Sequence, residues 1–457
     1  MKVAMVVSEM EPFAKTGGLA DVAGALPRAL GRIGVELHVF LPRYACVKEA
    51  ESRVEISQGV TVHFVEKPDF FQRPSLYGNS DGDYPDNLER FSFFCRQVFH
   101  QMKSAGIRPD LLHAHDWQAA LSIVYLANQF KEDPFFAKTA SVFTIHNLAY
   151  QGLFPKDQFP KLELPWSLFT INGLEFYDRV NLLKGGLNFA RTLTTVSPTY
   201  AREIQIKEQG EGLEGVLRMR SQDLTGILNG IDQELWNPEK DSLIPHPFDS
   251  KKLAIKAKNK AVLQKEMGLP ADPKVFLVGM VTRLASQKGL DLVVEALPRL
   301  SSLGLQLAIL GSGDRAIEEA LSRSSSSSKV VGVRLAFDNA LAHRIYAGSD
   351  AFLMPSRYEP CGLGQMIAMR YGTVPIVRQT GGLADTVQEV RPVEENGNGF
   401  CFQPAEPQPM VEAVMRALAL FRTPSNWKSL QQRVMSIDFS WDRSAQEYLR
   451  LYEKLIA

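Results

Sequence analysis

Short, continuously apolar runs recur along this chain, and stretches of helical length lie between them. The first run, Lys2–Ser8, is apolar throughout after Lys2, as expected for a strand that is buried on both faces. The segment that follows, residues 18–34, places Leu19, Val22, Ala23 and Leu26 on one helical face and reaches a glycine at its end. Strands that alternate with helices in this way predict an α/β fold built on parallel sheets.

The chain is long enough for two domains, because 457 residues exceed what one hydrophobic core usually supports. A polar, proline-containing stretch at 237–250 has the composition of a linker, and the α/β alternation restarts after it with a basic helix. We therefore predict two Rossmann-like domains, 1–245 and 246–440, followed by a terminal helical segment, 441–457. The serine-rich stretch 322–329 is expected to form an exposed, flexible connection between a helix and a strand.

Composition excludes several classes of protein. The 51 basic and 51 acidic side chains balance, so bulk charge gives no reason to expect a nucleic-acid partner. No apolar stretch approaches the roughly 20 residues of a membrane span, and the N-terminal apolar run is too short for a signal peptide. The four cysteines lack CxxC spacing, which argues against zinc and against a disulfide framework. These features predict a cytoplasmic protein with free thiols and no membrane association.

The sequence Thr-Gly-Gly-Leu-Ala-Asp occurs twice, at 16–21 and at 380–385. The flanking sequences differ completely, which disfavours a duplicated domain. Both copies follow a predicted strand and open a predicted helix, and ligands of open α/β sheets bind at the carboxyl ends of the strands. Two glycine turns that serve one ligand are therefore a better interpretation, although an ordinary glycine-rich turn remains an alternative for each. Only the first copy is preceded by a lysine, Lys15, so a phosphate contact is assigned there.

Charged residues in the second half also follow predicted strands. Arg283 and Lys288 lie five positions apart on one such loop, where they form either a phosphate clamp or a solvated surface. Glu359 lies directly before Pro360 and the turn 361–363. Its carboxylate either caps a helix or accepts hydrogen bonds from sugar hydroxyls.

Several long motifs occur in a fixed order: KTGGLADV, HAHDWQA, FTIHNLAYQG, LNGID, the Arg283/Lys288 pair and SRYEPCGLGQM. In this order they resemble the bacterial glycogen synthases and plant starch synthases, and the likeness extends from residue 2 to about residue 452. The resemblance implies a retaining glucosyltransferase of the GT-B fold, in which two Rossmann-like domains face each other across a cleft and the last helix returns to the N-terminal domain. Such an enzyme transfers glucose from a nucleotide sugar, usually ADP-glucose in bacteria, to the non-reducing end of an α-1,4-glucan.

The resemblance also implies roles for individual residues. The residues that it implies to be catalytic are Arg283, Lys288, Glu359, His146 and Asp116. Donor contacts fall to Lys15, Gly17, Gly18, Asp21, Asn229, Phe337, Cys361, Gly362, Leu363, Thr380, Gly381 and Gly382. Tyr84 and Asn87 are candidates on the acceptor side.

Simpler structural roles compete with some of these assignments. Asp116 is equally suited to cap the helix that follows it, and His113 fits a buried, hydrogen-bonded histidine better than a ligand-binding one. Cys361 fits a small buried residue. Phe337 stands where relatives often have tyrosine, and its ring can still stack on adenine.

The resemblance and the motifs predict neither a metal nor pyridoxal phosphate. The Asp81-Gly82-Asp83 sequence imitates a metal-binding motif of another glycosyltransferase fold, but no strand precedes it. A cofactor lysine motif of the glucan phosphorylases is absent. An epimerase of the same fold, without a glucan acceptor, and a catalytically silent glucan-binding protein are the alternative functions, and the oligomeric state is left open.

Overall fold

A computed structural model describes residues 1–79, 82–391 and 396–457. The chain divides into two compact units: unit 1 comprises Met1–Gly230 and Trp441–Ala457, and unit 2 comprises Ile231–Ser440. The boundary predicted near residue 245 is therefore too late. The stretch 237–250 is not a free linker, because Asp241 accepts hydrogen bonds from Tyr371 (2.5 Å) and His343 (2.7 Å), both in unit 2.

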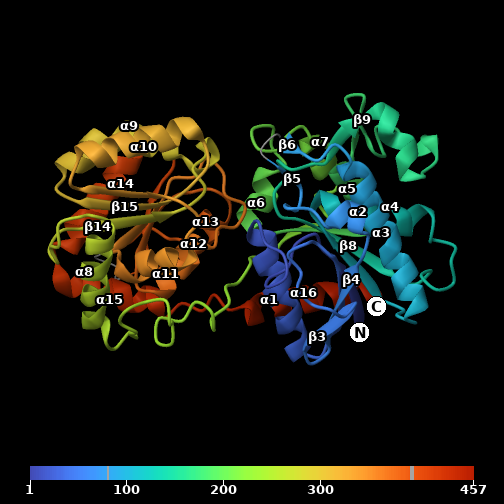
Figure 1. Ribbon diagram of the computed structural model, residues 1–457, viewed down its shortest axis with the longest axis horizontal. Helices are drawn as coiled ribbons and strands as arrows, with labels where there is room; N and C mark the ends of the chain where they lie inside the picture. The colour runs from blue at the N-terminus through green and yellow to red at the C-terminus, as the bar shows by residue number, and fades with distance from the viewer. Residues whose placement is uncertain (80–81, 392–395) are drawn as a thin grey trace. The chain divides into compact units, whose positions relative to one another are not determined.

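Unit 1 is built on a sheet that is parallel except for its last strand (Figure 1). Its order in the described residues is β13 (Leu224–Gly226), β12 (Thr192–Thr195), β8 (Ala140–Ile145), β7 (Leu111–His115), β1 (Lys2–Val6), β2 (Glu36–Pro42), β4 (Val60–Val65) and β3 (Arg53–Ser57). Two smaller sheets join β10 (Glu175–Phe176), β11 (Arg179–Asn181) and β9 (Leu153–Pro155), and β5 (Gly78–Asn79) with β6 (Gly82–Asp83).

Helices cover both faces of this sheet. Its α-helices are α1 (Gly18–Arg32), α2 (Pro68–Phe71), α3 (Asn87–Ser104), α4 (Asp116–Asn128), α5 (Leu182–Phe189), α6 (Pro198–Glu203), α7 (Glu214–Met219) and α16 (Trp441–Ile456), and its 3-10 helices are η1 (Lys156–Leu162) and η2 (Trp166–Leu168). Side chains alternate along β1, so Val3 and Met5 pack in one core with α1 and α16, whereas α4 packs on β7 and β8 beside α3 and α5.

The terminal helix α16 belongs to unit 1, as predicted, and lies beside α1 (Figure 1). Its apolar face buries Trp441, Tyr448 and Tyr452 in the core of that unit. The hydroxyl of Ser444 donates to the carbonyl of Leu228 at 2.5 Å, which fixes the start of the helix.

Unit 2 is built on a sheet that is parallel throughout. Across the part of the chain that the structure describes, its order is β16 (Val331–Leu335), β15 (Gln306–Gly311), β14 (Leu277–Val281), β17 (Ala351–Met354), β18 (Val374–Arg378) and β19 (Phe400–Phe402). Its helices are η3 (Leu253–Ile255), α8 (Lys256–Glu266), η4 (Ser286–Lys288), α9 (Leu290–Ser302), α10 (Arg315–Ser327), α11 (Asn339–Gly348), α12 (Gly364–Arg370), α13 (Gly381–Thr386), α14 (Pro407–Phe421) and α15 (Pro424–Met435). Apolar side chains of α9 and α14 pack with β14 and β18 in its core.

The serine-rich stretch is helical rather than a flexible connection. Asp314 caps α10 by accepting the backbone N–H groups of Ala316 and Ile317. Within the helix, the hydroxyl of Ser326 donates to the carbonyl of Ser322 at 2.9 Å, one turn earlier, so this side chain bonds to the helix backbone in its helical form. The Asp314 cap opposes the weak helix propensity of serine.

Candidate active site

The first glycine turn is held by a buried carboxylate that sequence reasoning missed. Glu9, just beyond β1, accepts the backbone N–H groups of Thr16 (2.6 Å) and Gly17 (3.0 Å) and the hydroxyl of Thr16 (2.6 Å). Its other contact is the hydroxyl of Tyr77, at 2.8 Å. The position of Glu9 directly after a buried strand was the available signal. These bonds fix the turn and leave Lys15 at the surface, where its Nζ lies 2.6 Å from Asp21 Oδ1.

The glycines of this turn are not explained by the fold itself. Gly17 has an extended backbone (φ −149°), which any residue adopts. A Cβ placed on Gly17 or Gly18 meets no atom within 4 Å. Neither conformation nor packing requires glycine here, and the space beside the backbone is open.

Histidines and one aspartate gather at the carboxyl ends of β7 and β8. His115 Nδ1 lies 2.8 Å from His146 Nε2, and the two rings stack with centroids 5.2 Å apart. Burial lowers the pKa of His146 to about 3, so the imidazole is neutral at physiological pH. His115 is buried, and its Nε2 has no hydrogen-bond partner among the described residues. A neutral, hydrogen-bonded pair presents a fixed polar edge without a net charge.

Asp116 orients this pair rather than capping its own helix. It has φ 56°, and its Oδ1 accepts the backbone N–H of His146 at 2.7 Å. The N-cap of α4 is His115 and Asp116 is the first residue of the helix, so the alternative that makes Asp116 the N-cap is wrong. Burial raises the pKa of Asp116 to about 7, against the opposing effect of the N–H groups that it accepts.

His113 is a satisfied buried histidine, as predicted. Its Nδ1 lies 2.7 Å from the hydroxyl of Tyr452, and its Nε2 lies 2.6 Å from Thr144 Oγ1. Both ring nitrogens are therefore occupied, and the role of His113 is to join the terminal helix to the sheet.

In unit 2, Lys288 and Glu359 form an ion pair. Lys288 Nζ lies 2.8 Å and 2.7 Å from the two carboxylate oxygens, and Glu359 also accepts the hydroxyl of Ser356 at 2.9 Å. Arg283 is exposed on the same strand-to-helix loop as Lys288, and it donates to Gln287 Oε1 at 3.0 Å. Lys288, one of the two cations predicted to bind phosphate, thus lies beside the carboxylate predicted to bind sugar.

The second glycine turn has a structural explanation that the first lacks. Gly381 has φ 44°, and a Cβ on it would lie 1.9 Å from the carbonyl oxygen of Glu359. A Cβ on Gly382 would lie 2.1 Å from the carbonyl oxygen of Cys361. Both glycines and Thr380 are buried, and they hold α13 against the loop 359–361. Close backbone packing therefore accounts for both glycines, and their donor contact stays a prediction.

The remaining predicted residues divide between exposed and buried positions. Phe337 is 89% exposed just before α11, and Asn229 is buried with an Oδ1 that has no partner in the described ranges. Cys361 is buried, as its structural alternative predicts, and Gly362 (φ 70°) and Leu363 lead into α12.

The two acceptor candidates differ in their surroundings. Asn87 is buried, its Nδ2 donates to Tyr77 O (2.9 Å) and its Oδ1 accepts from Arg90 (2.6 Å). Its acceptor contact stays a prediction. Tyr84 is half-buried and packs against the guanidinium groups of Arg73 and Arg90. Asp81 of the Asp-Gly-Asp sequence lies outside the described residues.

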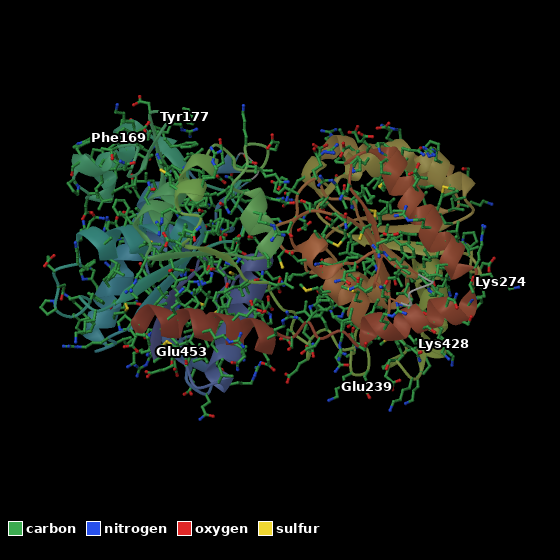
Figure 2. The ribbon with its side chains drawn as sticks, turned by 180° about the vertical axis from the view of Figure 1, so that it is seen from behind. Phe169, Tyr177, Glu239, Lys274, Lys428 and Glu453 are labelled. Carbon is green, nitrogen blue, oxygen red and sulfur yellow. The ribbon has the colours of Figure 1, made fainter. Side chains whose placement is uncertain are left out.

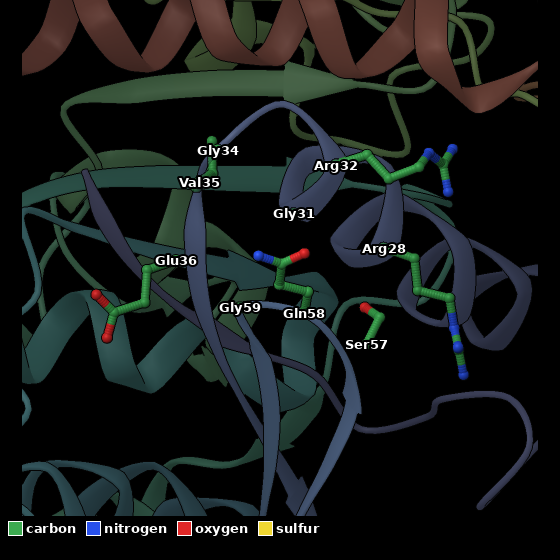
Figure 3. A pocket seen from close by; sticks show the side chains of 9 residues that line it. All are labelled: Arg28, Gly31, Arg32, Gly34, Val35, Glu36, Ser57, Gln58 and Gly59. Carbon is green, nitrogen blue, oxygen red and sulfur yellow. The ribbon is translucent and has the colours of Figure 1, made fainter.

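A hollow of about 400 Å³ at the opposite end of the unit 1 sheet does not have the features of a site (Figure 3). Arg32 is paired with Asp442, and Arg28 donates to the carbonyls of Gly24 and Ile56. Figure 3 shows both guanidinium groups and the Glu36 carboxylate directed away from Gln58 at its centre. Polar groups therefore do not converge there.

The described residues offer neither a metal-binding cluster nor a membrane-spanning helix. Among residues 1–79, 82–391 and 396–457, no group of three or more His, Cys, Asp or Glu side chains is placed to hold a metal ion. Within the same ranges, no helix combines the length and apolar character needed to cross a membrane.

Comparison with known proteins identifies the class. Residues 2–219 match the family model described as the starch synthase catalytic domain, and residues 262–432 match that of the glycosyl transferases group 1. A sucrose-phosphate synthase from Thermosynechococcus elongatus shares the fold, with a TM-score of 0.65 at 19% identity over 99% of this chain and 98% of that one. The two Rossmann-like units and these matches define a glycosyltransferase of the GT-B class.

Proteins with higher sequence identity identify the family within this class. A glycogen synthase of Syntrophotalea carbinolica is 47% identical over 100% of this chain and 99% of its own, and glycogen synthase 2 of Geobacter sulfurreducens is 49% identical over 99% and 98%. The catalytic domain of starch synthase IV from Arabidopsis thaliana, bound to ADP and acarbose, has a TM-score of 0.90 at 36% identity, covering 99% of both chains. The chain belongs to the glycogen and starch synthase family.

Proposed function

We propose that this enzyme transfers glucose from ADP-glucose to the non-reducing end of an α-1,4-glucan, with retention of configuration. The observation that carries the proposal is the Lys288–Glu359 pair, in which a cation and a carboxylate lie together beyond the strands of unit 2. Support comes from the relatives, which are glycogen synthases, and from the Arabidopsis starch synthase, whose structure contains ADP and acarbose.

Unit 2 binds the donor in this proposal. The Lys288 ammonium and the Arg283 guanidinium neutralise the diphosphate and stabilise the charge that grows on it as the glycosidic bond breaks. Glu359 accepts hydrogen bonds from hydroxyls of the donor glucose, so Lys288 exchanges part of its contact with Glu359 for phosphate oxygens. The exposed ring of Phe337 stacks on adenine.

Unit 1 supplies the groups that act at the sugar. His146 is held by His115 and Asp116, and its neutral imidazole donates or accepts a hydrogen bond without attracting a counterion. Lys15 and the open backbone at Gly17 and Gly18 serve the same diphosphate, with Asp21 and Asn229 as further donor contacts.

For the chemical step we propose front-face displacement. The leaving phosphate oxygen takes the proton of the acceptor hydroxyl while the new glycosidic bond forms on the same face. The cations lower the barrier by stabilising the departing ADP, so the reaction needs neither a metal nor pyridoxal phosphate. Full activity after exhaustive treatment with EDTA is the expected result. The four cysteines are free and three are buried, which suits the reducing cytoplasm.

Release of ADP from ADP-glucose tests the proposal against its main alternative. We expect release to require a glucan and to equal the glucose incorporated. A GT-B-fold epimerase converts the nucleotide sugar without a glucan and leaves the nucleoside diphosphate attached. Glucan-independent conversion of the donor would therefore overturn the proposed function.

A further inference from the structure

Helix α8 buries two lysines in unit 2 that the proposed site does not use. Lys256 and Lys260 lie four positions apart on one face of the helix, and they are 5% and 3% exposed. Lysine side chains usually extend into solvent, as those of Lys274 and Lys428 do at the surface of unit 2 (Figure 2). A buried ammonium loses its hydration, so specific partners must offset the cost of burying it.

Lys256 binds the carboxyl-terminal ends of two helices. Its Nζ lies 3.1 Å and 2.9 Å from the carbonyl oxygens of Tyr346 and Ala347, in the last turn of α11. The same atom lies 3.0 Å from the carbonyl oxygen of Tyr371, the C-cap of α12, and 2.7 Å from Thr373 Oγ1. Carbonyl groups at helix ends have no partner within their own helix, and the helix dipole places negative charge there. One ammonium therefore joins the end of α11 to the end of α12.

The charge of Lys256 is costly at this position. Burial lowers the pKa of Lys256 to about 7, although Asp350 opposes this shift, and the neighbouring Lys260 lowers the pKa further. Lys256 is also the first residue of α8, where the dipole of its own helix disfavours a cation. The contacts with α11 and α12, rather than α8 itself, therefore account for a charge here.

The opposite end of α11 carries a residue that is predicted to contact the donor. Phe337 stands directly before Asp338, which caps α11 by accepting the backbone N–H of Leu341 at 2.8 Å. The helix has ten residues and is about 15 Å long. Lys256 thus holds the far end of the helix that presents Phe337.

The start of α12 carries further predicted donor contacts. The turn 361–363 leads directly into this helix. Gln365 lies in the first turn of α12, and its Nε2 donates to the carbonyl oxygens of Gly362 (2.9 Å) and Cys361 (3.2 Å). The turn is therefore tied to α12, whose other end is bound to Lys256.

We propose that Lys256 is a positioning residue for donor binding, which fixes α11 relative to α12 so that Phe337 and the turn 361–363 meet one nucleotide together. The inference rests on the proposed function, because both groups are predicted to contact the donor of that reaction. Without the ammonium, the ends of the two helices lose the cation that they share. Donor binding must then order the two contact groups, and affinity falls by the cost of that ordering.

Lys256→Met tests the proposal in the full-length enzyme, with Lys260→Met as the matched control. Lys260 is also buried, one turn further along α8, and its Nζ contacts Asp350 Oδ2 (2.7 Å) and the carbonyl oxygens of Pro273 (3.0 Å) and Val275 (2.6 Å). None of these three partners belongs to α11 or α12. Both substitutions remove a buried ammonium and lower stability, but only Lys256→Met releases the two helix ends.

The assays separate donor binding from stability and from acceptor binding. Kd for ADP is measured by isothermal titration calorimetry at about pH 6, where the Lys256 ammonium is charged, together with Tm and with KM for ADP-glucose and for glycogen. We expect Lys256→Met to raise Kd for ADP and KM for ADP-glucose by about 3- to 20-fold, while KM for glycogen stays at the wild-type value. Lys260→Met should lower Tm and leave all three constants unchanged.

Thr373→Val is a milder second variant, which keeps the test open if Lys256→Met does not fold. It removes one of the four acceptors of the ammonium and leaves the charge in place. We expect a smaller rise in Kd for ADP, with KM for glycogen again unchanged.

Wild-type ADP affinity in Thr373→Val and in folded Lys256→Met would overturn the inference. A rise in Kd that Lys260→Met shares with Lys256→Met would overturn it as well, because such a rise would follow from lost stability alone. Failure of the proposed function is a different result: wild-type enzyme would then incorporate no glucose from ADP-glucose, and the ADP titrations of the variants would still be compared in the same way.

Discussion

The two Thr-Gly-Gly turns provide a matched pair of substitutions with opposite expected results. In Gly382→Ala, the new Cβ falls 2.1 Å from the carbonyl oxygen and 2.5 Å from the Cα of Cys361. Both are backbone atoms, which cannot move aside as a flexible side chain can. Overpacking of this kind costs about 1–3 kcal/mol, which corresponds to a fall in Tm of roughly 3–10 °C for a unit of this size.

Gly17→Ala is expected to lower activity and to leave stability unchanged. The backbone there is extended and no atom lies within 4 Å of the new methyl group, so stability stays within about 0.5 kcal/mol of wild type. The methyl group instead occupies the open space where we propose that the donor diphosphate binds. We expect kcat/KM for ADP-glucose to fall about 10- to 100-fold, which is ~1.4–2.8 kcal/mol of transition-state stabilisation.

Differential scanning fluorimetry and initial rates at varied ADP-glucose measure both effects on the same preparations. A Gly17→Ala enzyme with normal kcat/KM would refute the assignment of this turn to the donor. A Gly382→Ala enzyme with unchanged Tm would refute the structural explanation of the second turn.

Three further predictions concern single contacts. Lys288→Ala removes the ammonium from Glu359 and from the diphosphate, so kcat should fall by about 10²-fold or more with a normal far-UV spectrum; near-normal turnover would contradict the clamp. The pKa of Asp116 is raised from 3.8 to about 7 in the folded state, so the folded protein holds a proton that the unfolded chain releases, and the contribution of Asp116 to the free energy of unfolding should decline as pH rises through that interval and level off above about 7. Because the lowered pKa values of His113 and His146 give the opposite slope, the quantity to measure is the difference in free energy of unfolding between wild type and Asp116→Asn in urea from pH 5 to 8. This difference should decline with pH, and a constant difference would contradict the raised pKa. Tyr452→Phe leaves His113 Nδ1 buried without its partner, which should cost about 1–3 kcal/mol in chemical unfolding; an unchanged unfolding midpoint would show that the contact does not hold the terminal helix.

The alternation of apolar strands and helices was sufficient to predict the α/β class and the parallel sheets, because these features follow from local periodicity. The return of α16 to unit 1 was predicted only from the family resemblance, since nothing in the periodicity of the last helix indicates which domain it joins. The domain boundary was harder to predict from the sequence. The polar residues at 237–250 make specific contacts within unit 2, such as Asp241 with His343, and composition does not reveal such contacts. The serine-rich end of α10 was predicted wrongly as a flexible connection. Its composition alone does not reveal that it continues a helix whose cap, Asp314, lies before the stretch.

The candidate site was predicted in part. Motifs pointed to Lys288 and Glu359 separately, whereas their direct pairing depends on two strands that are distant in sequence. Glu9 was missed because its position after a buried strand indicates the sheet edge, but does not indicate that its carboxylate binds the backbone N–H groups of Thr16 and Gly17. The identical glycine turns differ in their surroundings, which the six shared residues do not reveal: open space lies beside Gly17, and the 359–361 backbone lies beside Gly382.

The most direct test of the account is the incorporation of labelled glucose into glycogen from ADP-glucose, with UDP-glucose as the comparison donor. The account predicts glucan-dependent incorporation from ADP-glucose into chains that an α-1,4-specific glucosidase then digests completely. Failure of ADP-glucose to support incorporation, or a product with a β-linkage that resists this digestion, would contradict it.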